Sequence, residues 1–250
     1  LEAYGATTVN YNRDVEIYPV LAAIFEGIFG SCPYKSPTDM GVNMAGNCIY
    51  DDEVCQNASK QEIIRRYYSS LNRLAKGECK SEEVYKIELL MKQAKISTEL
   101  RKVVSAALLR AETTESPAAA IELPDKSIVT AKTSDLLGAS AALILNAVKV
   151  LGNIDDSIHL ISPTVIEPVQ KLKTNYLGSS NPRLHTDEIL IALSMCAASD
   201  DTAQLALEQL PKLRGCQVHT SVMLSNVDIK IFNKLGIQLT SEPRYEHRKL

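Results

Sequence analysis

In the first part of the chain, apolar side chains recur every three or four residues, which is the period of one face of an α-helix. The segment PVLAAIFEGIF starts with Pro19, and proline suits the first turn of a helix better than its interior, so we predict a helix from Pro19 to Gly30. The sequence SKQE fits a capping box and predicts a second helix over 59–76. Further helices are predicted from residue 81 and over 98–111.

The pattern changes after the polar segment TTESP, Thr113–Pro117, which we interpret as a domain boundary. Beyond it, AIEL and IVTAK flank the turn PDKS and predict a β-hairpin. Ser134–Leu151 is apolar nearly all round and predicts a helix that is buried or lies at an interface. Next come SIHLIS, predicted as a strand, TVIEPVQKL, predicted as a helix that Pro168 interrupts, and TDEILIALSMCAA, predicted as a helix capped by Thr186. The end of the chain predicts strand, helix, glycine stop and strand.

These patterns predict an α+β fold, with a mainly helical domain over 1–113 followed by an α+β domain over 117–250. The length of 250 residues allows two domains. The net charge of −3 and the absence of tryptophan argue against nucleic-acid binding. No apolar run approaches the roughly 20 residues of a membrane span, and no signal peptide is visible, so we expect a cytoplasmic protein. The chain starts with Leu1 instead of methionine, which indicates a processed or excised piece.

The sequence shows no pattern that is typical of a metal site or of a known catalytic motif. Its six cysteines form no CxxC pair and lie far from most histidines, so we expect neither a zinc site nor disulfides. Acidic residues over 51–53 offer carboxylates to a magnesium ion, but they equally suit the first turn of a helix. No residue pattern identifies a cofactor.

Three polar clusters are candidates for ligand binding. In KSPTDMGVNMAGN, Ser36 and Asp39 fit a helix cap, whereas Lys35 and Asn43 have no obvious local role. That segment is read either as capping chemistry or as a binding loop. In TTVNYNRD, a helix start at Pro19 leaves most of the polar residues in extended or turn backbone. There they either orient a polar ligand, or form a solvated loop or a buried polar network that joins domains.

The third cluster, GSSNPRLHTDE, places Arg183 and His185 just before a predicted helix. A helix N-terminus attracts anions, although Asp187 and Glu188 already supply negative charge there. His185 has the densest polar surroundings of the four histidines and is the best candidate for a general acid or base.

The segments YGATTVNYNRDVEIYPVL, YKSPTDMGVNMAG, ASKQEIIRRYY, LGSSNPRLHTDEILIAL and KLGIQLT together resemble the bacterial domain-of-unknown-function 1846 family. Family members are roughly twice as long as this chain, which resembles their carboxyl half. The resemblance implies that the missing amino-terminal half is an α/β domain with a glycine-rich segment similar to a phosphate-binding loop. It implies no particular reaction.

The resemblance also singles out the residues that its characteristic segments contain. If they form an enzyme site, the catalytic candidates are Asp14, Asp39 and His185. The ligand-binding candidates are Asn10, Asn12, Arg13, Lys35, Thr38, Asn43, Asn181 and Arg183. The leading hypothesis is the carboxyl half of a cytoplasmic enzyme acting on a phosphorylated or nucleotide-like small molecule, with the missing half completing the site. The alternative is a non-catalytic module that forms a homo-oligomer or binds partners through apolar faces such as Leu136–Leu151.

Overall fold

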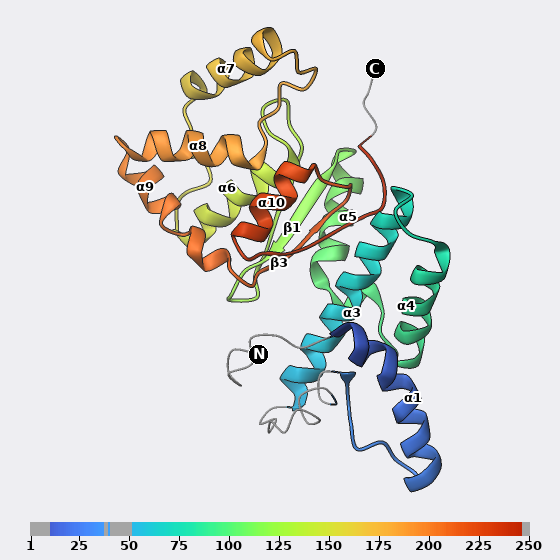
Figure 1. The fold of residues 1–250 in the computed structure, drawn as a ribbon. Helices are drawn as coiled ribbons and strands as arrows, with labels where there is room; N and C mark the ends of the chain where they lie inside the picture. The colour runs from blue at the N-terminus through green and yellow to red at the C-terminus, as the bar shows by residue number, and fades with distance from the viewer. Residues whose placement is uncertain (1–10, 38–39, 41–51, 247–250) are drawn as a thin grey trace. The chain divides into compact units, whose positions relative to one another are not determined.

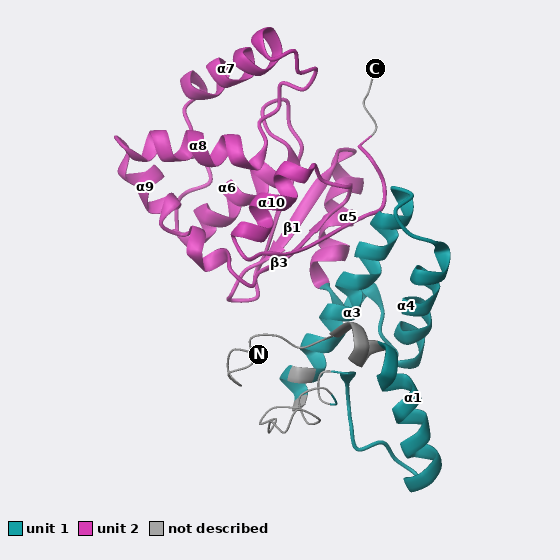
Figure 2. Cartoon of the chain, in the orientation of Figure 1, with its two compact units in different colours: residues 1–101 teal, residues 102–250 magenta. Residues whose placement is uncertain are grey.

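The computed structural model describes residues 11–37, 40 and 52–246. The chain forms two compact units, Leu1–Arg101 and Lys102–Leu250, which Figure 2 shows in different colours. Each unit is described by itself below. Within the described ranges, no helix combines the length and the apolarity that a membrane crossing needs.

The first unit is helical, as predicted. Its elements are α1 (Tyr11–Phe29), α3 (Asp52–Ala75), α4 (Ser81–Gln93) and the short 3₁₀ helix η2 (Thr98–Leu100). The helix predicted from residue 81 is confirmed, and α4 packs against both α1 and α3 (Figure 1). The core of this unit contains the buried side chains of Ile63, Ile64, Tyr68, Val84, Leu90 and Met91. The apolar faces that the sequence shows therefore form this core.

Two predicted helix starts in this unit are wrong. Helix α1 begins at Tyr11, so Pro19 lies inside it. A proline removes one backbone hydrogen bond from a helix but does not oblige the helix to begin there. Helix α3 begins at Asp52, and Ser59 is a buried residue within it instead of a cap.

The second unit contains a four-stranded sheet. Its strands are β1 (Ala118–Glu122), β2 (Ile128–Lys132), β3 (Gln217–Thr220) and β4 (Gln238–Ser241), in the order β2-β1-β3-β4. β1 pairs antiparallel with β2 and with β3, and β3 pairs parallel with β4. The predicted hairpin is confirmed, because β1 and β2 flank the PDKS turn.

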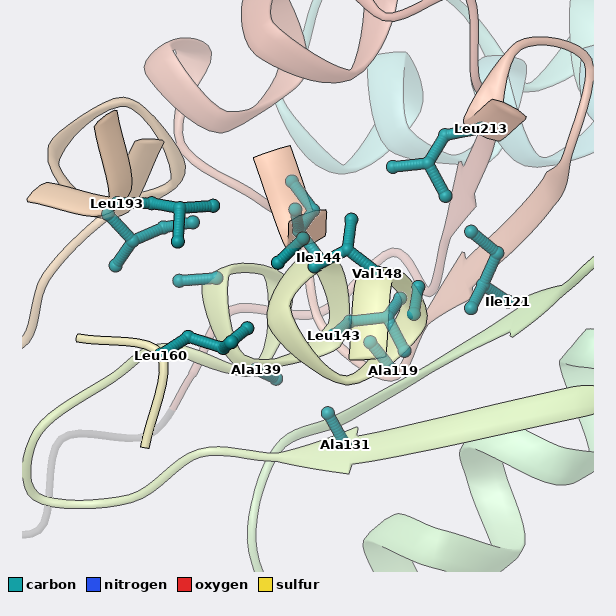
Figure 3. Close-up of a cluster of buried hydrophobic side chains, with 14 of the residues drawn as sticks. Ala119, Ile121, Ala131, Ala139, Leu143, Ile144, Val148, Leu160, Leu193 and Leu213 are labelled. Atoms are coloured by element: carbon teal, nitrogen blue, oxygen red, sulfur yellow. The ribbon is translucent and has the colours of Figure 1, made fainter. Parts of the chain in front are cut away.

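Helices cover both faces of this sheet (Figure 1). On one face, α5 (Lys102–Thr114) packs against the sheet, and its buried Val103 and Ala107 cluster with Ala120 of β1. On the other face lies α6 (Ala139–Leu151), whose Leu143 and neighbouring apolar residues share the main core with Ala119 of β1 (Figure 3). Successive residues of β1 therefore point to opposite layers, as the period of a strand requires.

All the remaining elements except the π-helix contribute side chains to the main core. The remaining elements are α7 (Pro163–Lys171), the π-helix η3 (Leu172–Tyr176), α8 (Thr186–Ala197), α9 (Asp201–Leu207), the 3₁₀ helix η4 (Leu210–Leu213) and α10 (Asn226–Lys234). Together with the sheet they confirm the predicted α+β class. The predicted boundary at Thr113–Pro117 lies inside the second unit, after α5, whereas the two compact units divide after Arg101.

Three local predictions in this unit are wrong. SIHLIS is not a strand, because the Asp155 side chain accepts hydrogen bonds from Ser157 and holds a turn, while Leu160 and Ile161 enter the core from irregular backbone. The predicted helix over 134–151 begins later, at Ala139 after Gly138. Thr186 is the first helical residue of α8, and His185 occupies the capping position.

Candidate functional site

The candidate site of the second unit lies where the amino ends of α8 and α10 meet. Ser225 caps α10, because its hydroxyl accepts a hydrogen bond from the Asp228 backbone N–H at 3.2 Å. The same hydroxyl donates to Asp228 Oδ2 at 2.8 Å. This arrangement fixes the carboxylate of Asp228 in the first turn of α10, with only 6% of its side chain exposed.

The Asp228 carboxylate also caps the neighbouring helix. Its Oδ1 accepts hydrogen bonds from the backbone N–H and the hydroxyl of Thr186, at 3.0 and 2.9 Å. Its Oδ2 lies 3.2 Å from Nδ1 of His185. One buried carboxylate therefore joins the two helix ends and holds the imidazole of His185, which is 34% exposed.

This contact shifts the protonation of both partners. Burial raises the pKa of Asp228, but hydrogen bonds from His185, Thr186 and Ser225 outweigh it and lower the pKa from 3.8 to about 2. The hydrogen bond to Asp228 raises the pKa of His185 above 6.5, against the lowering effects of burial and of Lys173. The pair therefore favours a charged carboxylate beside an imidazole that gains a proton readily.

A second carboxylate secures the segment that leads into α8. Glu188 Oε2 accepts hydrogen bonds from the His185 backbone N–H at 2.7 Å and from Lys173 Nζ at 2.8 Å. Lys173 is buried and also donates to the backbone carbonyl of Arg183 at 2.5 Å. His185 is thus held through its ring and through its backbone.

The start of α8 is poorly suited to an external anion. The Thr186 N–H donates to Asp228, and the Glu188 N–H donates to Asp187 Oδ1 at 2.9 Å. These carboxylates already satisfy backbone N–H groups at this helix end and supply negative charge. The geometry favours proton transfer by a fixed imidazole over anion binding by the helix end.

The structure brings three of the predicted site residues together in this segment. Asn181 Oδ1 accepts a hydrogen bond from the Arg183 backbone N–H at 3.1 Å, and His185 follows two residues later. Arg183 Nη1 makes an ion pair with Glu246 Oε1 at 2.6 Å, in which both side chains are about one-third exposed. The sequence pattern did not indicate Asp228, Ser225 or Lys173. The Ser-x-x-Asp spacing of the first two was the available signal, since that spacing is typical of a helix cap.

The predicted residues of the first unit are placed differently from expectation. Asn12, Arg13 and Asp14 occupy the first turns of α1, so the prediction that they lie in extended or turn backbone is wrong. The physical reason is that α1 includes residues before Pro19, because a proline inside a helix costs one backbone hydrogen bond without ending the helix. The remaining four, Asn10, Thr38, Asp39 and Asn43, lie outside the described residues.

Lys35 lines a cavity of about 410 Å³ within the first unit. Its other lining residues come from α1, α3, α4 and the segments beside them, and they include Lys60, Gln56 and Gln93. Apolar side chains such as Ile63 contribute to its wall. A cavity of this size with a few convergent polar groups is typical of a small-molecule site.

Metal ligands are not clustered in the described part of the chain. Across residues 11–37, 40 and 52–246, no group of three or more histidine, cysteine, aspartate or glutamate side chains could hold a metal ion. The cysteines that the structure describes as free thiols are Cys32, Cys79, Cys196 and Cys216.

The helical first unit and the sheet-containing second unit, in which a buried carboxylate holds a partly exposed histidine, define a two-unit α+β protein. Two family models match this chain. Residues 99–250 match the C-terminal domain of unknown function DUF1846, and residues 1–95 match the N-terminal domain of the same name. The chain therefore belongs to the DUF1846 family.

Its similar proteins carry the name UPF0371. One from Corynebacterium diphtheriae is 55% identical over 250 residues, which is all of this chain and 50% of that relative. Another, from Streptococcus uberis, is 50% identical over 250 residues, which is 51% of that relative. The chain thus spans about half the length of the curated relatives it matches. The part of the Corynebacterium diphtheriae relative that this chain does not match is called the complementary half below.

Proposed function

We propose that the protein is part of an enzyme that acts on a phosphorylated or nucleotide-like small molecule in the cytoplasm, with His185 as the residue that transfers a proton. The observation that carries this proposal is the contact between the buried Asp228 carboxylate and the imidazole of His185, at 3.2 Å. Perturbed titratable pairs of this kind are more frequent at functional sites than elsewhere.

The chemistry of the pair supports proton transfer. When Nδ1 of His185 donates its hydrogen to Asp228, the other ring nitrogen, Nε2, is the atom that accepts or releases a proton. Because the hydrogen bond to Asp228 raises the pKa of His185 above 6.5, this imidazole takes up a proton more readily than an ordinary histidine does. The carboxylate stabilises the imidazolium that forms and keeps the ring in one orientation.

The cavity of the first unit supports the phosphorylated substrate class. Lys35 and Lys60 both line it, and ammonium groups bind phosphate as compact positive charges. Asn10, Asn12, Arg13, Thr38 and Asn43 are proposed to add contacts to the same ligand, with Asp14 and Asp39 as further groups that move protons. In the second unit by itself, Asn181 and Arg183 are proposed ligand contacts, and Arg183 would exchange its partly exposed pairing with Glu246 for an anionic ligand group.

The length of the relatives supports a site that another part of the polypeptide completes. This chain accounts for about half of each relative, so we assign the remaining contacts to the complementary half. Ligand sites are frequent at junctions between domains. The enzyme as a whole is therefore proposed to be the joined protein, in which this chain is linked to the complementary half.

A ligand screen of the joined protein tests this proposal. Inorganic phosphate, pyrophosphate and ATP serve as probes, with unfolding temperature as the first readout and phosphate release as the second. A probe at a hundred times its Kd should stabilise the protein by about 2.7 kcal/mol. Replacing Lys35 by alanine should weaken its binding by about 1.5–3 kcal/mol, the range for a charge-assisted contact.

Two further variants separate binding from chemistry. His185→Gln should bind the probe normally and lose phosphate release, whereas Lys126→Ala, a change at a largely exposed lysine, should behave like the wild type. If no probe stabilises the protein, the substrate class is wrong. If His185→Gln retains full turnover, the proton-transfer role is wrong.

A module that only assembles a homo-oligomer is the competing function. The apolar face expected for such assembly, Leu136–Leu151, packs largely inside the unit. Its residues Leu143, Ile144 and Val148 are buried in the main core. No observation on this face favours the assembly function over the enzyme.

A further inference from the structure

Helix α1 carries an exposed apolar face. Val20, Ile24 and Ile28 follow one another at intervals of four residues, which places them on one side of the helix. Their exposed fractions are 60%, 47% and 67%. This set of three residues is called the α1 apolar face below.

The opposite side of α1 belongs to its own unit. Pro19, Ala22, Ala23 and Glu26 line the cavity that α1 shares with α3 and α4. At 100° per residue, these positions lie roughly opposite the α1 apolar face. A helix of an isolated globular unit normally turns its apolar side toward the core and its polar side toward water. In α1 the most apolar side points away from the unit.

Neighbouring contacts hold α1 in this orientation. The Tyr18 hydroxyl donates a hydrogen bond to the Tyr34 carbonyl at 3.3 Å, and Phe25 packs edge-on against the Tyr34 ring with centroids 5.8 Å apart. Both contacts tie α1 to the segment that follows it. The exposure of the α1 apolar face is therefore a feature of the folded unit, and exposed apolar surface of this kind marks an interaction site.

The occupant of this face follows from the length of the polypeptide. The chain supplies about half of each similar relative, and its first 95 residues match the N-terminal family domain. The Corynebacterium diphtheriae relative therefore contains a further 50% of its length that is available to cover the first unit. We infer that the α1 apolar face is the docking surface for the complementary half, which presents an apolar groove or sheet face to Val20, Ile24 and Ile28. The inference rests on the two-part organisation proposed above and does not depend on the reaction at His185.

The same substitutions, made in two contexts, test this inference. In this chain, Ile24→Ser and Ile28→Ser change exposed positions, so each should alter the unfolding equilibrium constant less than twofold. In the joined protein the same side chains are buried, so each should raise that constant about tenfold, as measured by urea unfolding. Ile191→Ser is the matched control, because Ile191 lies on α8 and is 62% exposed. It should have less than a twofold effect in both contexts.

Two independent readouts complete the test. Backbone amides of α1 should exchange hydrogen more slowly in the joined protein than in this chain. His185→Gln should leave this protection unchanged, which separates a failure of docking from a failure of the proposed reaction. Equal effects of Ile28→Ser in both contexts would overturn the inference. So would sedimentation of this chain as a dimer that Ile28→Ser dissociates, because the occupant would then be a second copy.

Discussion

Replacing Asp228 by asparagine should destabilise the second unit and lower the pKa of His185. The substitution keeps the shape of the side chain but replaces the charged carboxylate, whose oxygens accept hydrogen bonds from Thr186, His185 and Ser225. An asparagine can accept through only one of its two terminal atoms, so at least one of these donors loses its acceptor. Because the side chain is buried, water does not replace the lost contact.

The magnitude follows from the pKa of the carboxyl group. The native pKa of about 2 lies about 1.8 units below the ordinary value of 3.8, and each unit corresponds to about 1.36 kcal/mol. The charged form therefore contributes about 2 kcal/mol to the free energy of unfolding. Since the native pKa is lowered, this contribution is fully present above pH 3.8 and is lost as the pH falls through about 2.

The contribution of His185 to stability changes with pH in the opposite direction. Its native pKa is raised from 6.5, so its share of the stability is present below pH 6.5 and is lost as the pH rises through the native pKa. The two windows overlap between pH 3.8 and 6.5. The difference between wild type and Asp228→Asn should therefore be largest in that range.

Urea unfolding across this pH range and an NMR titration of His185 form the assay. Asp228→Asn should cost about 2–3 kcal/mol, and the His185 pKa should fall because its main raising contact is gone while burial still lowers it. Asp187→Asn is the matched control: it removes a carboxylate from the same helix end and should cost only about 0.3–1 kcal/mol. Equal losses in the two variants, or an unchanged His185 titration, would refute the reasoning.

Two further predictions concern the architecture of the second unit. Glu188→Gln should cost about 2–4 kcal/mol in urea unfolding, because it leaves the buried ammonium of Lys173 without its charged partner, and the double variant with Lys173→Met should recover part of that loss. A fragment over 102–250 should unfold cooperatively, whereas a fragment over 117–250 lacks α5 and should not, since Ala120 loses the cover of Val103 and Ala107. Cooperative unfolding of the shorter fragment would contradict this prediction and support a domain boundary at Thr113–Pro117.

The elements that the sequence predicts well are those whose local and long-range preferences agree. The β1–β2 hairpin combines two short apolar runs with a turn, and its pairing needs no distant partner. Helix α4 combines an apolar face with a clear start at Ser81. Helix α10 ends before Gly236, whose φ of +73° is the left-handed conformation that glycine adopts most easily at a helix end.

Elements were misread where one strong local signal outweighed weaker ones. Pro19 is a conspicuous residue, but the helix it was expected to start extends back to Tyr11. SIHLIS alternates like a strand, yet all four strands of the described sheet come from other segments. An apolar pair such as Leu160 and Ile161 reaches the core equally well from irregular backbone. Periodicity shows which residues are buried more reliably than it shows the backbone that carries them.

The candidate site shows why local sequence patterns identify only part of a functional site. His185 is identified by its polar neighbours in sequence, but the group that sets its protonation is Asp228, which lies 43 residues away along the chain. The Ser-x-x-Asp spacing of Ser225 and Asp228 could have indicated only a local helix cap, which the structure contains. The carboxylate nevertheless reaches beyond its own helix and caps α8 as well. Because this second role depends on how two helix ends meet, it becomes visible only once the fold is built.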